Sequence, residues 1–280
     1  MANTTTINSE LFTKLLAEAQ FAAYENSVAR QIVTPFDVAA NQGKQVQVPV
    51  WAGITADTPT EGSAATAKDT NTTEATITLA EAVAYFQVTD MLRDSAGSDV
   101  ISSIANQAGR SIAEAMDTSV FDLFTSFTTD LGPGAGAELT VDHLMKSAAT
   151  LRSNKLTGPF VAVLHPKQAY NVKKGLTNSG ASNIPSLSNV GNEILSRFYI
   201  GSVAGIEVYE SGLIDVDGSD DAIGAVFAKS AIGHAMRGTL KIEEQRDAKT
   251  RATDLVVSAV HGAAILQDTH GVKLTSDAAL

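Results

Sequence analysis

The chain has 280 residues, of which 44% are hydrophobic and 18% are charged, so it can bury one or two ordinary cores and is not disordered throughout. Its formal charge of −11 and its lack of clustered Lys and Arg argue against a surface that wraps nucleic acid through phosphate contacts. Because it contains no cysteine, disulfides, thiolate metal ligands and cysteine nucleophiles are excluded.

Residues 1–42 are predicted to form an N-terminal arm. The chain begins MANTTTINSE, without the basic start and apolar run of a signal peptide, and no segment nears the roughly 18 apolar residues of a membrane span. We therefore expect a soluble protein made in the cytoplasm. A helix with one apolar side is predicted from Glu10, ending before Thr34 and Pro35 because a proline disfavours helical geometry in the preceding residue.

Residues 43–90 are predicted to form a long hairpin. Apolar and polar residues alternate in two extended segments, Gly43–Gly53 and Thr73–Asp90, and the residues between them are mostly small or polar. A two-stranded ribbon is marginal in water, and a tip of Ala, Thr, Gly and Ser buries too little apolar area to offset its ordering entropy. We expect the hairpin and the arm to be buried against other copies of the chain.

A long amphipathic helix is predicted over Ser98–Phe127, within residues 91–137. Its apolar face is predicted from residues at steps of three and four: Ile101, Ile104, Ala108, Ile112, Ala115, Ser119, Leu123 and Phe127. Arg110, Glu114 and Asp117 fall on another face. At a rise of about 1.5 Å per residue the helix would be roughly 40 Å long, which predicts a spine around which the rest is arranged.

The middle of the chain, residues 138–222, is predicted to be a compact α/β subdomain. Thr140 can cap a helix, which is followed by a continuous apolar strand, Phe160–Leu164, of the kind covered on both faces. A short helix near Ala169 and a strand at Ile206–Tyr209 complete the unit. Residues 223–280 are predicted to return as strands of a sheet on the spine helix, namely Ile223–Phe227, Thr239–Glu243, Leu255–Ile265 and a short strand around Val272 and Leu274.

Glu114 and Asp117 could form a general acid and base pair if they share a helix face. Arg110 lies four residues before Glu114, so an ion-paired or inter-subunit face is the alternative. Trp51 on the hairpin is either a core residue or an inter-subunit anchor.

Arg246 and Arg251 lie in a segment of mixed charge, Lys241–Asp254, which is either a solvated hairpin tip or a set of pairs across symmetry axes. The candidate inter-subunit contacts are therefore Trp51, Arg110, Glu114, Asp117, Arg246 and Arg251.

Metal and cofactor motifs are weak. Four aspartates in the segment DVDGSDD, at 215, 217, 220 and 221, could ligate calcium, but Gly218 comes too early for an EF-hand loop, which favours a solvated turn. The five histidines have no metal-ligand spacing, and there is no Walker lysine or GxSxG elbow. We expect no catalytic residue, cofactor or metal.

The order of these parts resembles the major capsid proteins of tailed bacteriophages, which have the Hong Kong 97-like fold. The strongest local match is FQVTDMLRDSAGSDVISSIANQAGRSIAEAMDTSVFDLF, in which a strand leads through a turn into the spine. Three further segments resemble the opening of the family's axial domain, its later strand pair and the last strands of its peripheral domain: VAVLHPKQAYNVKK, IGSVAGIEVYES and RATDLVVSAVHGAAILQDTHGVKL. The expected fold class is α+β, with an N-terminal arm, an extended hairpin loop, a spine helix with a peripheral sheet, and an axial domain.

The resemblance implies hexamers and pentamers that close into an icosahedral phage head around double-stranded DNA, without sequence-specific binding and without a membrane. Because the chain starts almost directly at the arm, a separate scaffolding protein or a cleaved precursor is expected. A portal and possible cement or decoration proteins are further partners, and the virion is the expected location. Some relatives cross-link Lys to Asn, but neither Lys44 nor Lys68 matches that position, so no cross-link is predicted.

Three alternatives stay open at this point. An encapsulin-type nanocompartment shares the fold and a similar length, and a neighbouring gene for terminase or portal would argue against it. A soluble α/β hydrolase using Glu114 and Asp117 would elute as a small oligomer in size-exclusion chromatography. A surface-adhesion or decoration protein would give fibres or no particles in electron micrographs.

Overall fold

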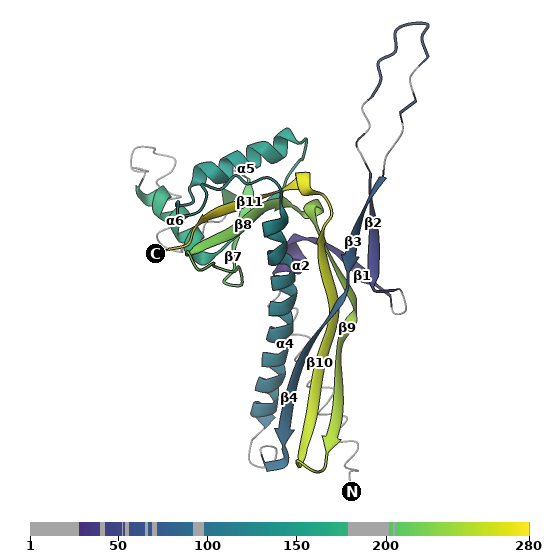
Figure 1. Ribbon diagram of the computed structural model, residues 1–280, viewed down its shortest axis with the longest axis vertical. Coiled ribbons are helices and arrows are strands. Elements are labelled where there is room, and N and C mark those ends of the chain that lie inside the picture. The colour runs from purple at the N-terminus through teal and green to yellow at the C-terminus, as the bar shows by residue number, and fades with distance from the viewer. Residues whose placement is uncertain are drawn as a thin grey trace.

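The computed structural model describes residues 28–39, 43–51, 53, 56–64, 67–68, 72–91, 98–178, 202–203 and 205–279. The helix predicted from Glu10 lies outside these residues. Figure 1 shows three parts: an elongated shaft, a compact unit at one end of it, and a two-stranded ribbon that projects past that end.

One long helix, α4 (Ser98–Phe121), runs along the shaft and continues into the 3-10 helix η1 (Asp122–Ser126). The predicted spine is confirmed, although its last turn tightens. Its predicted apolar face is partly wrong. Among the helix residues whose burial is described, the buried ones are Ala105, Ala108, Gly109, Ile112, Ala113, Met116, Asp117, Val120 and Phe121. The predicted Ile104, Ala115, Ser119 and Leu123 are only half-buried. A helix has 3.6 residues per turn, so a row of four-residue steps drifts around it, and the sheet covers the side centred on Ile112 and Met116.

The shaft sheet has four strands in the order β1-β9-β10-β4. Its strands are β1 (Thr34–Val38), β4 (Ala80–Thr89), β9 (Ile232–Asp247) and β10 (Ala252–Ile265). The first of these pairs parallel with β9 after the single helical turn of α2 (Ala29–Ile32), a pairing that the sequence did not indicate. Apolar side chains from α4, β9 and β10 close the layer between helix and sheet, among them Ile112, Met236 and Val257.

A bulge divides the longest strand. Lys241 pairs with Ser258 and Arg237 with Val260, so residues 238–240 of β9 lie opposite Ala259 alone. Gly238 has a φ of 64° there, a conformation that suits glycine because it has no Cβ. The upper part of β9, next to β1, is therefore offset from the lower part that ends in the hairpin tip.

The compact unit is built on a five-stranded sheet in the order β11-β8-β5-β7-β6. Its strands are β5 (Phe160–Leu164), β6 (Ser202–Val203), β7 (Ile206–Glu210), β8 (Asp221–Ala228) and β11 (Gly271–Asp277). The short 3-10 helices η3 (Lys229–Ala231) and η4 (Asp268–His270) connect this sheet to the shaft. The expectation that residues 223–227 and 272–274 join the sheet on the spine helix is wrong, since β8 pairs with β5 and β11.

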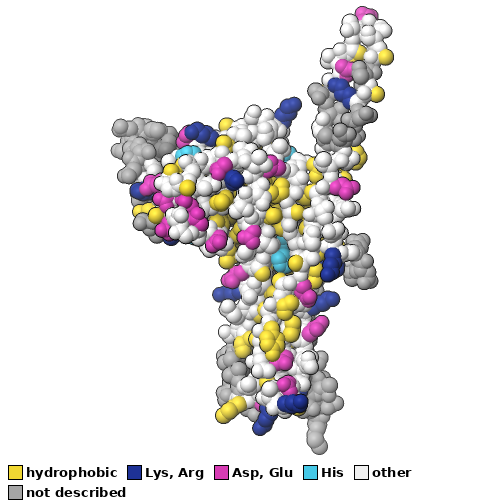
Figure 2. Space-filling model, in the orientation of Figure 1, with side chains coloured by type: hydrophobic (Ala, Val, Ile, Leu, Met, Phe, Trp, Pro, Cys, Tyr) yellow, Lys and Arg dark blue, Asp and Glu magenta, His cyan; other side chains and the backbone are white. Residues whose placement is uncertain are grey.

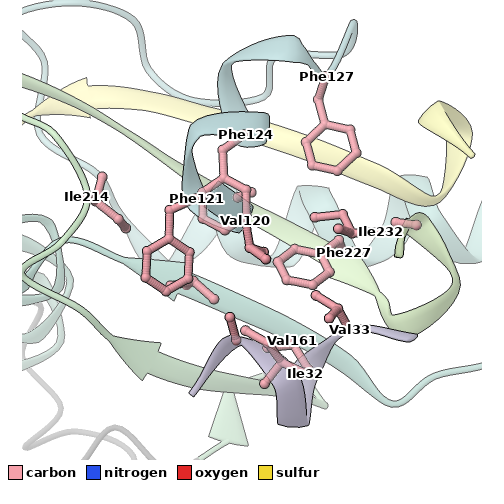
Figure 3. Close-up of a cluster of buried hydrophobic side chains, with 14 of the residues drawn as sticks. Ile32, Val33, Val120, Phe121, Phe124, Phe127, Val161, Ile214, Phe227 and Ile232 are labelled. Atoms are coloured by element: carbon pink, nitrogen blue, oxygen red, sulfur yellow. The ribbon is translucent and has the colours of Figure 1, made fainter. Parts of the chain in front are cut away.

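Both faces of this sheet are covered, which explains why every residue of β5 is buried. On one face lie α5 (Val141–Ser153) and α6 (Pro166–Asn178), as predicted from Thr140 and Ala169, although α6 is longer than expected. On the other face lie the end of α4, η1 and α2. Figure 3 shows this second layer, where Phe124 and Phe227 approach with ring centroids 5.6 Å apart. The layer fixes the unit to the shaft.

The ribbon consists of β2 (Gln45–Trp51) and β3 (Thr72–Thr78), which pair antiparallel from Gln45–Thr78 to Trp51–Thr72. The predicted hairpin is thus confirmed at its base, but its second arm is shorter than expected. After Leu79 the chain enters β4, which pairs with β10 in the shaft sheet. Residues 80–89 therefore belong to the shaft, and β2 and β3 form the ribbon that projects from it.

Candidate assembly interface

The ribbon buries little of itself, since no residue of β2 and only Ile77 of β3 is fully buried. Along β2, exposed and half-buried residues alternate, so Val46, Val48 and Val50 share one face and Trp51 lies on the other. The Trp51 side chain is 65% exposed, which excludes the core alternative within this chain. A large exposed aromatic side chain on a projecting strand suits a contact with another molecule.

The base of the ribbon is anchored in the shaft. Ile77 and Leu79 are buried with Val38 and Ala235, and the Leu79 N–H donates to the Lys44 carbonyl over 2.9 Å. The Arg237 guanidinium also donates to the Gly43 carbonyl. The ribbon is therefore held at its root, and Val50 and Trp51 pair with Thr73 and Thr72 of the partner strand.

Asp117 acts inside the chain. It is 3% exposed, and its two carboxylate oxygens accept the backbone N–H groups of Val28 and Ala29, each over 3.1 Å. These N–H groups begin α2 and have no partner within that helix, so the carboxylate caps it. The expectation that Asp117 shares an exposed face with Glu114 is wrong, because the one side chain is buried toward α2 and the other is exposed.

Arg110 and Glu114 lie on the exposed side of α4. Within the described residues, no ion pair forms between them or from either one to another side chain. Their charges point into solvent from the middle of the shaft, so both stay candidates for contacts between subunits.

Arg246 and Arg251 meet at Asp90, at the tip of the β9–β10 hairpin. Arg246 binds the Asp90 carboxylate with both terminal nitrogens, over 2.6 and 2.8 Å, and Arg251 Nε lies 3.7 Å from Asp90 Oδ2. The hydrogen bond to Asp90 raises the pKa of Arg246. The tip is exposed in the single chain, and both arginines bind there an aspartate that sequence reasoning did not single out. Pairing across symmetry axes stays a prediction.

The sheet face opposite α4 carries exposed apolar side chains. Val83 is 55% and Tyr85 61% exposed on β4, and the Tyr85 hydroxyl donates to Asp254 on β10 over 3.0 Å. That hydrogen bond is the main reason that the pKa of Tyr85 is raised. The sequence of residues 80–89 already indicated an exposed apolar face, because successive residues of a strand point to opposite faces and apolar residues occur at both sets of positions. Figure 2 shows hydrophobic side chains along the shaft, while acidic side chains gather over the compact unit.

The acidic segment forms a closed turn. Asp217 Oδ1 accepts the N–H groups of Ser219 and Asp221, over 2.8 and 2.9 Å, and Asp221 Oδ1 accepts the N–H of Gly136 over 2.7 Å. In the described part of the chain, no group of three or more His, Asp or Glu side chains is placed to hold a metal ion. The turn thus explains Asp217 and Asp221 as acceptors for backbone N–H groups.

The exposed ribbon and the long shaft are consistent with the known proteins that this chain resembles. The family model described as phage capsid protein matches residues 73–274, so the chain belongs to the phage capsid protein family. It is a structural, major capsid protein of the virion, with the predicted Hong Kong 97-like fold. No curated protein matches the sequence.

Solved structures support the fold. The capsid of cyanophage P-SCSP1u matches with a TM-score of 0.69 at 18% identity, over 88% of this chain and 86% of that one. The head of Helicobacter pylori bacteriophage KHP40 matches with a TM-score of 0.68 at 14% identity, over 88% of each chain. A virus-like particle from Pyrococcus furiosus matches with a TM-score of 0.63 at 15% identity, over 94% of this chain and 98% of that one. Among the helices that the structure describes, none is both long and apolar enough to cross a bilayer.

Proposed function

We propose that the chain assembles as hexamers and pentamers into an icosahedral phage head that encloses double-stranded DNA. The observation that carries this proposal is the ribbon of β2 and β3, which projects from the molecule with Trp51 65% exposed. In the shell each ribbon lies on a neighbouring copy, which supplies the apolar cover that its own chain does not. Repeated head-to-tail contacts of one surface with a different surface generate rings and, with curvature, closed shells.

Further partners follow from the same proposal. With a formal charge of −11, the chain holds DNA by enclosure and not by sequence-specific contacts. A separate scaffolding protein sets the size of the shell, a portal occupies one vertex, and cement or decoration proteins are candidate additions. Assembly takes place in the host cytoplasm.

We infer no enzymatic activity. The hydrolase alternative needed Glu114 and Asp117 on one face, but Asp117 is buried and occupied by two backbone N–H groups. The phage capsid family match favours a phage head over an encapsulin-type compartment or an adhesion protein.

The proposal is tested by expressing the chain with its candidate scaffolding protein and counting closed particles by negative-stain electron microscopy. Replacing Trp51 with Ala should lower the ratio of particles to free subunits by about tenfold or more, as expected for loss of an aromatic anchor. Trp51→Phe keeps an aromatic ring and should retain most of the particles, which makes it the matched control.

Two results would contradict the proposal. The first is that the wild-type chain forms no closed particles with its scaffold and that its ribbon resists protease as a dilute single copy. This result would contradict assembly into a shell. The second is a full particle yield from Trp51→Ala with an unchanged circular dichroism spectrum. This result would show that Trp51 is not a contact needed for assembly.

A further inference from the structure

Two histidines lie in the layer between the spine helix and the shaft sheet. His234 on β9 is 2% exposed and His261 on β10 is 7% exposed. Their rings stack, with centroids 5.7 Å apart and planes inclined by 27°. His261 pairs in register with Met236, whose side chain packs against α4. The pair therefore sits where the helix meets the upper half of the sheet.

The hydrogen bonding of the pair suits neutral rings. Neither ring nitrogen of His234 has a hydrogen-bond partner in the described structure. His261 Nδ1 lies 3.5 Å from the Ser119 hydroxyl, which already donates to the Met116 carbonyl over 2.7 Å. An added proton on His234 would thus find no acceptor, and a buried charge without a partner is costly.

The charged groups around the pair do not compensate such a proton. Arg30 on α2 contacts the Met236 sulfur over 3.5 Å and is paired with Asp37 on β1 over 3.0 Å. Asp117 on α4 has both oxygens on the N–H groups of α2. From β4, Ala80 is the residue in register with His261, and Glu81 is exposed. Among these charged groups, the one that acts on His234 is Arg30, and its charge is positive.

These surroundings shift both titrations downward. Burial, the neighbouring His261 and Arg30 together lower the pKa of His234 to about 4, and burial lowers that of His261. The pKa of a histidine in an unfolded chain is near 6.5. Between about pH 6.5 and pH 4, the state in which this layer is open to water therefore binds more protons than the folded state. The stability that the neutral pair contributes is thus complete above about pH 6.5 and is lost as the pH falls through this window.

We propose that His234 and His261 form an acid-sensitive latch that holds the spine helix on the shaft sheet while both rings are neutral and releases it when they are protonated. This inference goes beyond shell assembly and applies to the single chain. Protonation puts positive charge between the stacked rings and beside Arg30, and the layer can relieve that charge only by opening to water. The strand β5 contains no histidine and should open less; His165, which follows it directly and whose pKa burial also lowers, is the histidine beside this strand.

Hydrogen exchange followed by mass spectrometry tests this on the full chain, with rates corrected for the intrinsic effect of pH. In the wild type, peptides covering 232–237 and 259–265 should show an opening constant that rises about 100-fold or more from pH 7 to pH 4, because the lowered pKa of His234 alone requires a factor of that size. In His234→Phe, which keeps a stacked ring but cannot be protonated, the rise should fall well below that of the wild type. His270→Gln, which removes a half-buried histidine outside the layer, should keep the wild-type rise.

Clear results would overturn the latch. The wild-type rise persisting in His234→Phe would do so, as would an equal rise in the peptide that covers 160–164, because acid would then be acting on the whole chain. If His234→Phe does not fold, His234→Gln serves in its place. The comparison of layer and β5 peptides in the wild type needs no variant and decides the proposal alone.

Discussion

The strand at the centre of the compact unit and the first strand of the ribbon are both rich in valine, yet they behave differently. All of β5 is buried, whereas β2 alternates between exposed and half-buried residues. The difference lies in what covers them, because β5 has helices on both faces of its sheet and β2 has one partner strand and the shaft at its root. Residue type alone does not decide whether the side chains of a strand are buried within the single chain. The number of covered faces does.

The largest expected effect concerns the layer that fixes the compact unit to the shaft. Phe227 is fully buried and packs against Phe124, so Phe227→Ala leaves a cavity between the five-stranded sheet and η1. We expect the free energy of unfolding to fall by about 3–5 kcal/mol, measured by urea denaturation followed by circular dichroism. Tyr170→Ala, at a side chain that is 48% exposed on α6, is the control and should change it by less than about 0.5 kcal/mol. Equal losses in the two variants would mean that this layer is not a core.

A matched pair of substitutions tests the comparison directly. Val163→Ala in β5 removes two fully buried methyl groups and should cost about 2–3 kcal/mol of unfolding free energy. The same change at Val50 in β2 should cost less than about 1 kcal/mol in the free chain, because that side chain is only half-buried. Both values come from urea denaturation of unassembled subunits.

In assembly, the ribbon substitution should matter more than it does for the stability of the free chain. If the ribbon is covered by a neighbour, Val50→Ala should lower particle yield although the free chain is nearly as stable as the wild type. Similar losses of stability from Val50→Ala and Val163→Ala in the free chain would break the comparison, since the ribbon would then have a core of its own.

Local patterns of the sequence predicted much of the fold. The apolar run at 160–164, the cap at Thr140 and the long helix α4 each depend on residues close together in the chain, and each is confirmed, although the face predicted for α4 is partly wrong. Strand partners were predicted less well. The segments at 223–227 and 272–274 were recognised as extended but assigned to the wrong sheet, because alternation predicts a strand and not its neighbour.

The candidate contacts show the same limit. Helical spacing put Asp117 near Glu114, but the burial of Asp117 depends on the N-terminus of α2, which lies 88 residues earlier in the sequence. Asp90 was not singled out for the same reason, since Arg246 reaches it across 156 positions. Trp51 could be identified from the sequence, because a lone tryptophan on a poorly covered hairpin is conspicuous without a structure.

The smallest expected effect concerns the second long hairpin, whose tip closes itself. Arg246→Gln removes a bidentate ion pair that is exposed to solvent, and exposed pairs contribute little because water and salt screen them. We expect urea denaturation to show no resolved change in unfolding free energy, and hydrogen exchange to rise only in residues 247–251. Lys249→Gln, which removes the same charge from the tip without touching Asp90, is the matched control. A loss of stability in Arg246→Gln as large as that in Val163→Ala would contradict this. It would mean that the hairpin depends on one ion pair and not on the pairing of β10 with β9 and β4.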